Sequence, residues 1–166
     1  MFFVRRGILI KVNEILHNEK YKKYIDEIEF LERNREFCRH DINHFLDMAR
    51  IAYILVLENN LDYSKEVIYA IGLLHDIGRG EEYKNNINHD EASVMIAEEI
   101  LEETSYTDDE KGLIITAIKN HGNKDTQDEF LKIIYKSDKL SRNCFECKAE
   151  KDCYWSREKK NLQIKY

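Results

Sequence analysis

Residues 73–78 read Leu-Leu-His-Asp-Ile-Gly, an apolar run that ends in an imidazole and a carboxylate side by side before a glycine. Ile68 and Ile71 precede it at helical spacing, which predicts a helix with His75 on its core-facing side. Gly78 is placed to end this helix in a left-handed conformation. For an isolated pair, a buried histidine bonded to a carbonyl beside a surface aspartate is the simpler interpretation. The positions of the other histidines must therefore decide between a structural role and a ligand role.

The composition favours helices throughout. The chain has 166 residues, no proline and only six glycines, so both of the strongest helix breakers are scarce. The sequence therefore predicts an all-α fold, and its length suits a single domain over residues 1–166. We expect a core over about residues 40–142, N-terminal helices over residues 1–37 and a cysteine-containing tail over residues 143–166.

The charge pattern excludes some classes of partner. The formal net charge of −6 argues against a broad basic surface for nucleic acid, because phosphate neutralisation needs clustered Lys and Arg. Arg5 and Arg6 stand where a signal peptide needs an apolar region, and no later segment is long enough to span a membrane. We therefore expect a cytoplasmic protein without nucleic-acid or membrane partners, whose cysteines are reduced.

Start signals divide the chain into helices. The N-terminal region alternates apolar and charged positions over residues 8–37, which predicts one or two helices with Ile25, Ile28, Phe30 and Leu31 facing inward. In the core, side chains suited to capping precede each apolar periodic run. The expected N-caps are Asp41, Ser64, Asn88, Thr107 and Thr126, the last three each with a glutamate three residues later.

Histidines fall at the ends of these predicted helices. His44 lies at a helix start, His75 at an end, His89 at a start, and His121 at an end followed by Gly122 as a stop. In a bundle of antiparallel helices, starts and ends that alternate in this way meet at one end of the bundle. Asp138 reaches the same place from mid-helix if its helix crosses obliquely. The side chains expected to converge are His44, His75, Asp76, His89, His121 and Asp138.

Six such groups indicate a metal centre, because each buried polar group otherwise needs a partner of its own. Nitrogen and oxygen ligands without thiolate suit an open transition-metal site and do not suit a closed structural zinc. Six ligands exceed the need of one open ion, which predicts two ions with Asp76 as the bridge. Two such ions hold a hydroxide for in-line attack on phosphorus.

The order of these residues resembles the HD superfamily of metal-dependent phosphohydrolases, in which an early His, a His-Asp pair and a late Asp follow one another. His44, residues 75–76 and Asp138 meet this order. His89 and His121 look like the dinuclear, often iron-containing subgroup, and residues 134–140 (Ile-Tyr-Lys-Ser-Asp-Lys-Leu) are similar to the bacterial HD-type diadenosine tetraphosphatases. The resemblance implies an HD-type helical bundle with its metal site at one end, iron or manganese as the ions, and a nucleotide substrate.

One departure leaves the substrate open. Many HD proteins continue the first ligand as His-x-x-Arg-Val, whereas residues 44–48 read His-Phe-Leu-Asp-Met. We expect cleavage of a phosphate ester or phosphoanhydride of a nucleotide or similar small molecule. Asp76 and Arg79 are the catalytic candidates, and the polar segment over residues 79–86 is a candidate lid. Lys119 and Arg142 are alternative cations for the phosphate, and Arg79 is alternatively a solvated loop cation.

Two other function classes remain open. A metal-binding regulatory module without robust turnover fits the departure at Asp47 and the thiol-rich tail. A di-iron oxygenase on the same scaffold is the third alternative.

The cysteines and the residues just before the helix at Asp41 have further candidate roles. Cys144, Cys147 and Cys153, with Cys38 as a distant fourth, predict either a structural zinc site or reduced structural thiols. His40 and Asp41 are candidates for orienting a ligand imidazole, although Asp41 is equally explained as a helix cap.

Overall fold

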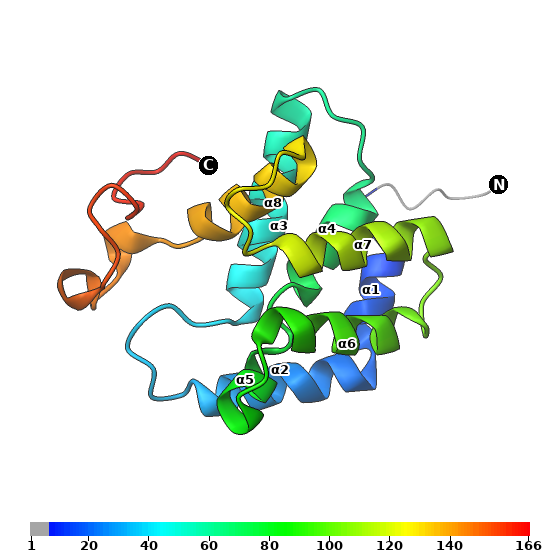
Figure 1. Cartoon of the computed structure of the whole chain (residues 1–166), viewed down its shortest axis with the longest axis horizontal. Coiled ribbons are helices and arrows are strands. Elements are labelled where there is room, and N and C mark those ends of the chain that lie inside the picture. Colours follow the sequence, from blue (N-terminus) through cyan, green and yellow to red (C-terminus); the bar gives the residue numbers. More distant parts are fainter. Residues whose placement is uncertain (1–6) are drawn as a thin grey trace.

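The computed structural model describes residues 7–166, and within this range the chain is helical and contains no strand (Figure 1). This confirms the all-α fold. The α-helices are α1 (Ile10–His17), α2 (Glu19–Leu31), α3 (Ile42–Glu58), α4 (Lys65–Leu74), α5 (Arg79–Asn85), α6 (His89–Leu101), α7 (Asp108–Asn120) and α8 (Glu129–Leu140), and the short 3-10 helices are η1 (Cys144–Glu146) and η2 (Glu150–Asp152).

Helix α3 is the central element of the fold. It packs against α4 and α8, while α4 also contacts α1 and α7, and α6 lies along α7 (Figure 1). Phe45, Met48, Ala49 and Ala52 of α3 have no solvent exposure. Asp41 caps the helix as predicted, because its carboxylate accepts a hydrogen bond from the backbone N–H of His44 at 2.9 Å.

Neither of the two glycines that follow predicted helix ends, Gly78 and Gly122, adopts a left-handed conformation. Gly78 has φ −83°, so the predicted left-handed stop is wrong there. Its N–H donates to Ser93 Oγ at 2.9 Å, and a Cβ at this position would lie 2.7 Å from Ala92 Cβ. The turn after α4 thus touches the backbone of α6, which only glycine permits. Helix α7 does end before Gly122 as predicted, with His121 as its C-cap, but Gly122 is not among the described glycines with positive φ.

Of the three predicted N-caps that have a glutamate three residues later, two cap their helices. Asn88 caps α6, and Thr107 forms a full reciprocal box at the start of α7. Thr126 does not cap α8. Its hydroxyl instead accepts a hydrogen bond from the backbone N–H of Asp128 at 3.3 Å. Asp128 is the cap instead. Ser64 occupies the N-cap position of α4 without a side-chain hydrogen bond.

The N-terminal region forms two helices, α1 and α2, and α2 contacts α5. Ile25 and Ile28 are buried as predicted. Phe30 is 62% exposed and Leu31 37% exposed, so their predicted inward position is wrong. They lie in the last turn of α2, where the Arg33 guanidinium covers the Phe30 ring at 4.1 Å from its centroid and the helical core no longer does.

The tail over residues 143–166 projects from the helical body (Figure 1). Apart from η1 and η2 it is irregular. Asn161 attaches it to α8, since its side-chain amide donates to the carbonyl of Lys139 at 2.7 Å. In the part of the chain that the structure describes, no helix has the length and apolar character needed to cross a bilayer.

Candidate metal centre

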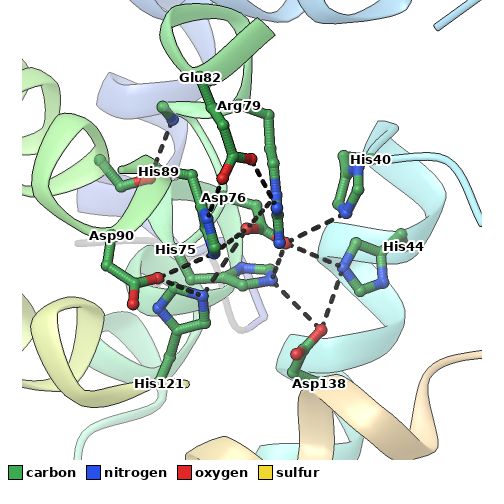
Figure 2. Close-up of polar contacts among 12 residues, drawn as sticks. His40, His44, His75, Asp76, Arg79, Glu82, His89, Asp90, His121 and Asp138 are labelled. Carbon is green, nitrogen blue, oxygen red and sulfur yellow. Dashed lines mark hydrogen bonds and ion pairs between the residues drawn. The ribbon is translucent and has the colours of Figure 1, made fainter. Parts of the chain in front are cut away.

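The structure brings the six predicted side chains together at one place (Figure 2). His44 comes from the first turn of α3, His75 and Asp76 from the turn that ends α4, His89 from the first residue of α6, and His121 from the end of α7. Asp138 differs from expectation, because it lies in the last turn of α8 rather than in mid-helix. Residues 122–128 connect α7 to α8 and allow both helices to end at the same centre.

The first half of the centre is a fully buried group of four side chains, His44, His75, Asp76 and Asp138, with one ligand atom from each within 4.8 Å of the others. His75 Nε2 lies 3.3 Å from Asp76 Oδ2, and His44 Nε2 lies 3.4 Å from Asp138 Oδ1. These separations leave room for an ion among the four atoms.

The second half shares Asp76 with the first. Asp76 Oδ1 lies 3.7 Å from Nε2 of His89 and 3.7 Å from Nε2 of His121, and the three side chains form a second candidate ligand group. The other oxygen, Oδ2, faces His44 and His75. The carboxylate of Asp76 therefore stands between two separate sets of imidazoles.

Hydrogen bonds at the far ring nitrogens set the direction of these imidazoles. His75 Nδ1 lies 2.9 Å from the carbonyl of Gly72, and His121 Nδ1 lies 2.6 Å from the carbonyl of Ile118. A carbonyl only accepts, so both Nδ1 atoms carry the proton of the neutral ring. In the neutral form of the ring, which is the form that binds a metal, their Nε2 atoms therefore present a lone pair to the centre.

His44 is held in the same way through a hydroxyl. Ser141 Oγ donates to the carbonyl of Asp138 at 2.6 Å and lies 2.9 Å from His44 Nδ1. Because the hydroxyl proton is used on Asp138, His44 Nδ1 donates to the Ser141 oxygen. His89 Nδ1 lies 3.1 Å from Glu82 Oε1, so a carboxylate orients the fourth ring.

The centre contains buried polar atoms that lack a hydrogen-bond partner in the protein. Nε2 of His44 and Nε2 of His75 are buried and have no hydrogen-bond partner. Leaving such an atom unsatisfied is unfavourable. A divalent ion held by nitrogen and oxygen would satisfy both atoms together, so the residues present fit a metal.

The charges of the centre favour a cation. Burial favours the protonated form of Asp76, yet His75 and the neighbouring imidazoles hold the pKa of Asp76 well below 3.8. Burial disfavours the imidazolium of His75, but Asp76 and Asp138 raise its pKa to about 9. Burial lowers the pKa of His44 to about 4. A metal that binds at neutral pH therefore finds His44 neutral and must displace a proton from His75.

Arg79, the predicted phosphate cation, is tied into the centre. Its Nε donates to Asp76 Oδ1 at 2.9 Å, and its NH1 group donates to Glu82 Oε2 at 2.9 Å. The segment predicted as a candidate lid contains helix α5, which packs on α2 and α6. Of the alternative cations, Lys119 is exposed on α7, while Arg142 is close enough to contribute to lowering the pKa of His44.

Asp90 is a residue of the centre that sequence reasoning missed (Figure 2). Its Oδ1 lies 2.9 Å from Nε2 of His89 and 3.4 Å from Nε2 of His121. Residues 89–90 repeat the His-Asp pair of residues 75–76. This repetition was the signal that would have identified Asp90.

His40 lies beside the centre and is oriented by Glu32, another missed residue. Glu32 accepts at 2.7 Å from the backbone N–H of His40, and its other oxygen lies 2.5 Å from His40 Nδ1. His40 Nε2 lies 3.6 Å from Asp76 Oδ2. Glu32, a buried acid at the end of α2, thus orients His40 and not one of the predicted ligand imidazoles, whereas Asp41 serves as the cap of α3.

The predicted zinc site at Cys144, Cys147 and Cys153 is not assembled in the structure. All four cysteines of the chain are free thiols. Over residues 7–166 no cysteine belongs to a group of three or more ligand atoms within 4.8 Å of one another. Apart from η1 and η2, the tail that carries these three cysteines is irregular.

Comparisons with known proteins agree with this geometry. The HD domain family model matches residues 41–143. An uncharacterized protein of Clostridium beijerinckii (strain ATCC 51743 / NCIMB 8052) is 40% identical over 156 residues, which is 94% of this chain and 99% of that protein. Ribonuclease Y of Mycoplasma pneumoniae (strain ATCC 29342 / M129 / Subtype 1) is 23% identical over 163 residues, which is 96% of this chain and 30% of the ribonuclease. No solved structure matches the chain.

The narrower resemblance is not supported. Neither the family match nor these relatives point to the dinuclear subgroup of diadenosine tetraphosphatases. The motif over residues 134–140 is explained by helix α8 itself, because Ile134, Ser137 and Asp138 are its buried positions. The match over residues 41–143 covers every ligand candidate of the centre, and this chain belongs to the HD domain family.

Proposed function

We propose that this protein is a metal-dependent phosphohydrolase that cleaves a phosphate ester or phosphoanhydride of a nucleotide or similar small molecule. The observation that carries the proposal is the position of Asp76, whose two oxygens face two different sets of imidazoles. Such an arrangement suits two ions bridged by one carboxylate.

The ligand sets follow from the two groups. His44, His75, Asp76 and Asp138 would hold one ion, and Asp76, His89 and His121 would hold the other, with Asp90 beside the second set. Mixed nitrogen and oxygen ligands without thiolate support iron or manganese. When bound, these ions supply positive charge for phosphoryl oxygens and lower the pKa of water.

The residues of the chain have defined tasks in this proposal. The carbonyls of Gly72 and Ile118 and the hydroxyl of Ser141 hold the imidazoles in the tautomer that presents Nε2 to the centre. The side chain of Arg79, beside Asp76, is 22% exposed. It can exchange its hydrogen bond with Asp76 for one with a phosphoryl oxygen and steady the charge that develops there.

The proposed substrate is small and anionic. The net charge of −6 disfavours a long polyanion, which would meet repulsion over most of the surface. A small phosphate group needs only the metal centre and a few cations. Ribonuclease Y acts on RNA by its name, but this chain spans only 30% of the length of that protein.

The test is phosphate release by the full chain reconstituted with Mn²⁺ or Fe²⁺, measured over a panel of nucleotides and generic phosphate esters. We expect Asp76→Asn to lower turnover by about 10²-fold or more, since the bridging ligand is weakened. Asp47→Asn is the matched control, because Asp47 lies on α3 and pairs with Arg50 at 3.1 Å. Full activity of Asp76→Asn would overturn the mechanism. Nucleotide binding by the wild type without phosphate release would instead support a regulatory module.

A further inference from the structure

The four cysteines of the chain line one cavity. This cavity has a volume of about 230 Å³ and lies between the start of α3 and the tail. Cys144, Cys147 and Cys153 line it from the tail, and Cys38 lines it from the segment between α2 and α3. No other cysteine exists in the sequence. A residue remote in sequence therefore lines the same cavity as the three tail thiols, and His44 and Ser141 of the candidate metal centre line another part of it.

The tail presents its thiols through tight turns. Cys144 begins η1 and Cys147 follows it, with the N–H of Cys147 donating to the carbonyl of Cys144 at 3.2 Å. Cys153 follows η2. A Cys-x-x-Cys turn with two further cysteines is a common ligand pattern of structural zinc sites. The fold supplies Cys38 as the fourth ligand candidate, which tail spacing alone does not.

The tail has little else to hold its fold. In residues 143–166 the buried apolar side chains are Cys144 and Ala149, whereas Tyr154 is 87% exposed and Ile164 is 79% exposed. A cross-link or a metal would stabilise a segment with so small a core. The cysteines are free thiols, so a metal is the cross-link for which the residues are available.

The electrostatic surroundings also link the four thiols. Burial raises the pKa of Cys38, the Arg142 guanidinium lowers it, and the other three cysteines raise it further. Arg39 and Arg142 both line the cavity. Two guanidinium groups offset the negative charge that four thiolates around a divalent ion would leave.

We propose that Cys38, Cys144, Cys147 and Cys153 form a four-thiolate site for zinc that fastens the tail to the segment before α3. Because no three sulfurs lie within 4.8 Å of one another here, binding would draw them inward by side-chain rotation until each sits about 2.3 Å from the ion. Four S–H protons are released to solvent and four Zn–S bonds form, with no change of oxidation state.

The first test uses the wild-type full chain with Zn²⁺ alone as the probe. We expect X-ray absorption at the zinc edge to show sulfur neighbours at about 2.3 Å. We also expect zinc to slow the reaction of all four thiols with a thiol reagent. Three results would each overturn the proposal. They are zinc scattering from nitrogen and oxygen only, thiols that react equally fast with and without zinc, and a disulfide between two of these cysteines.

Variants distinguish this cysteine site from the candidate metal centre of histidines and aspartates. Cys38→Ser should lose the thiolate-bound zinc, although Cys38 lies outside the tail, while Ser156→Ala, an exposed tail substitution, should keep it. Asp76→Asn should keep the zinc–sulfur signal and lose phosphate release. Loss of the zinc–sulfur signal in Asp76→Asn would show that the two sites are one and would overturn the proposal, whereas an inactive wild type that retains the signal would affect only the proposed hydrolase function.

Discussion

Arg79 donates a hydrogen bond from Nε to Oδ1 of Asp76 at 2.9 Å, and this oxygen is also the one that faces His89 and His121. The guanidinium therefore competes with any ion for the second half of the centre. Asp76 is 1% exposed, so water screens this competition poorly. Under the proposed function, Arg79 would thus link metal affinity to the binding of an anionic substrate.

Removing this cation should affect metal binding and turnover in opposite directions. Arg79→Gln should bind Mn²⁺ at the second half on the order of 10-fold more tightly, because a positive charge leaves Asp76. Phosphate release should fall, because a hydrogen bond to the developing charge is lost. Calorimetric titration and an activity assay measure the two effects. Arg50→Gln removes an exposed cation from α3 and serves as the control, and weaker Mn²⁺ binding by Arg79→Gln would contradict the competition.

The hydroxyl of Ser141 should matter for metal affinity. Ser141→Ala removes the acceptor that holds His44 Nδ1, which frees the ring to rotate and to change tautomer. We expect metal affinity to fall by about 10 to 100-fold, as measured by competition with a chelator of known affinity. Ser156→Ala should leave affinity unchanged. Equal affinities of the two variants would show that Ser141 does not orient His44.

Two glycine substitutions should have opposite effects on stability. Gly78→Ala places a Cβ against α6 and should destabilise the fold by about 1–3 kcal/mol. Gly112→Ala, on α7, meets no atom within 4 Å and should stabilise it by about 0.5–1 kcal/mol. Urea unfolding of the metal-free chain gives both free energies. Stabilisation by Gly78→Ala would mean that the turn after α4 has room to move away from α6.

Glu32 should make the metal-free protein sensitive to acid. Burial alone would raise the pKa of Glu32. The hydrogen bonds and charge of His40 and the hydrogen bond of Tyr83 outweigh this effect and lower the pKa from 4.5 to about 2. A carboxyl whose pKa is depressed in the folded state stabilises the fold above about pH 4.5, and this contribution is lost as the pH falls towards 2.

Glu32→Gln tests this pH dependence, because the amide cannot titrate and retains an oxygen that accepts from the His40 N–H. The unfolding free energy of the wild type should decrease more steeply between pH 5 and pH 2 than that of Glu32→Gln. Glu29→Gln, at an exposed position of the same helix, should follow the wild type. Parallel curves for wild type and Glu32→Gln would contradict the pKa assigned to Glu32.

Local patterns were enough to place several parts of this protein. Apolar periodicity and the caps at Asp41 and Thr107 determine where α3 and α7 begin, and a helix boundary fixes which residue stands at its end. Because His44 and His121 stand at such ends, their convergence followed from the order of starts and stops along the chain.

Only the tertiary structure decided the contacts between segments remote in sequence. Gly78 appeared to be a helix stop, but its actual role depends on how closely α6 approaches. The packing of the helices likewise decides three other contacts. Glu32 reaches His40 across a loop, Arg79 pairs with Asp76, and Cys38 lines the cavity beside the tail. The physical reason is that periodicity and capping act within a few residues, whereas approach distances are set by the packing of whole helices.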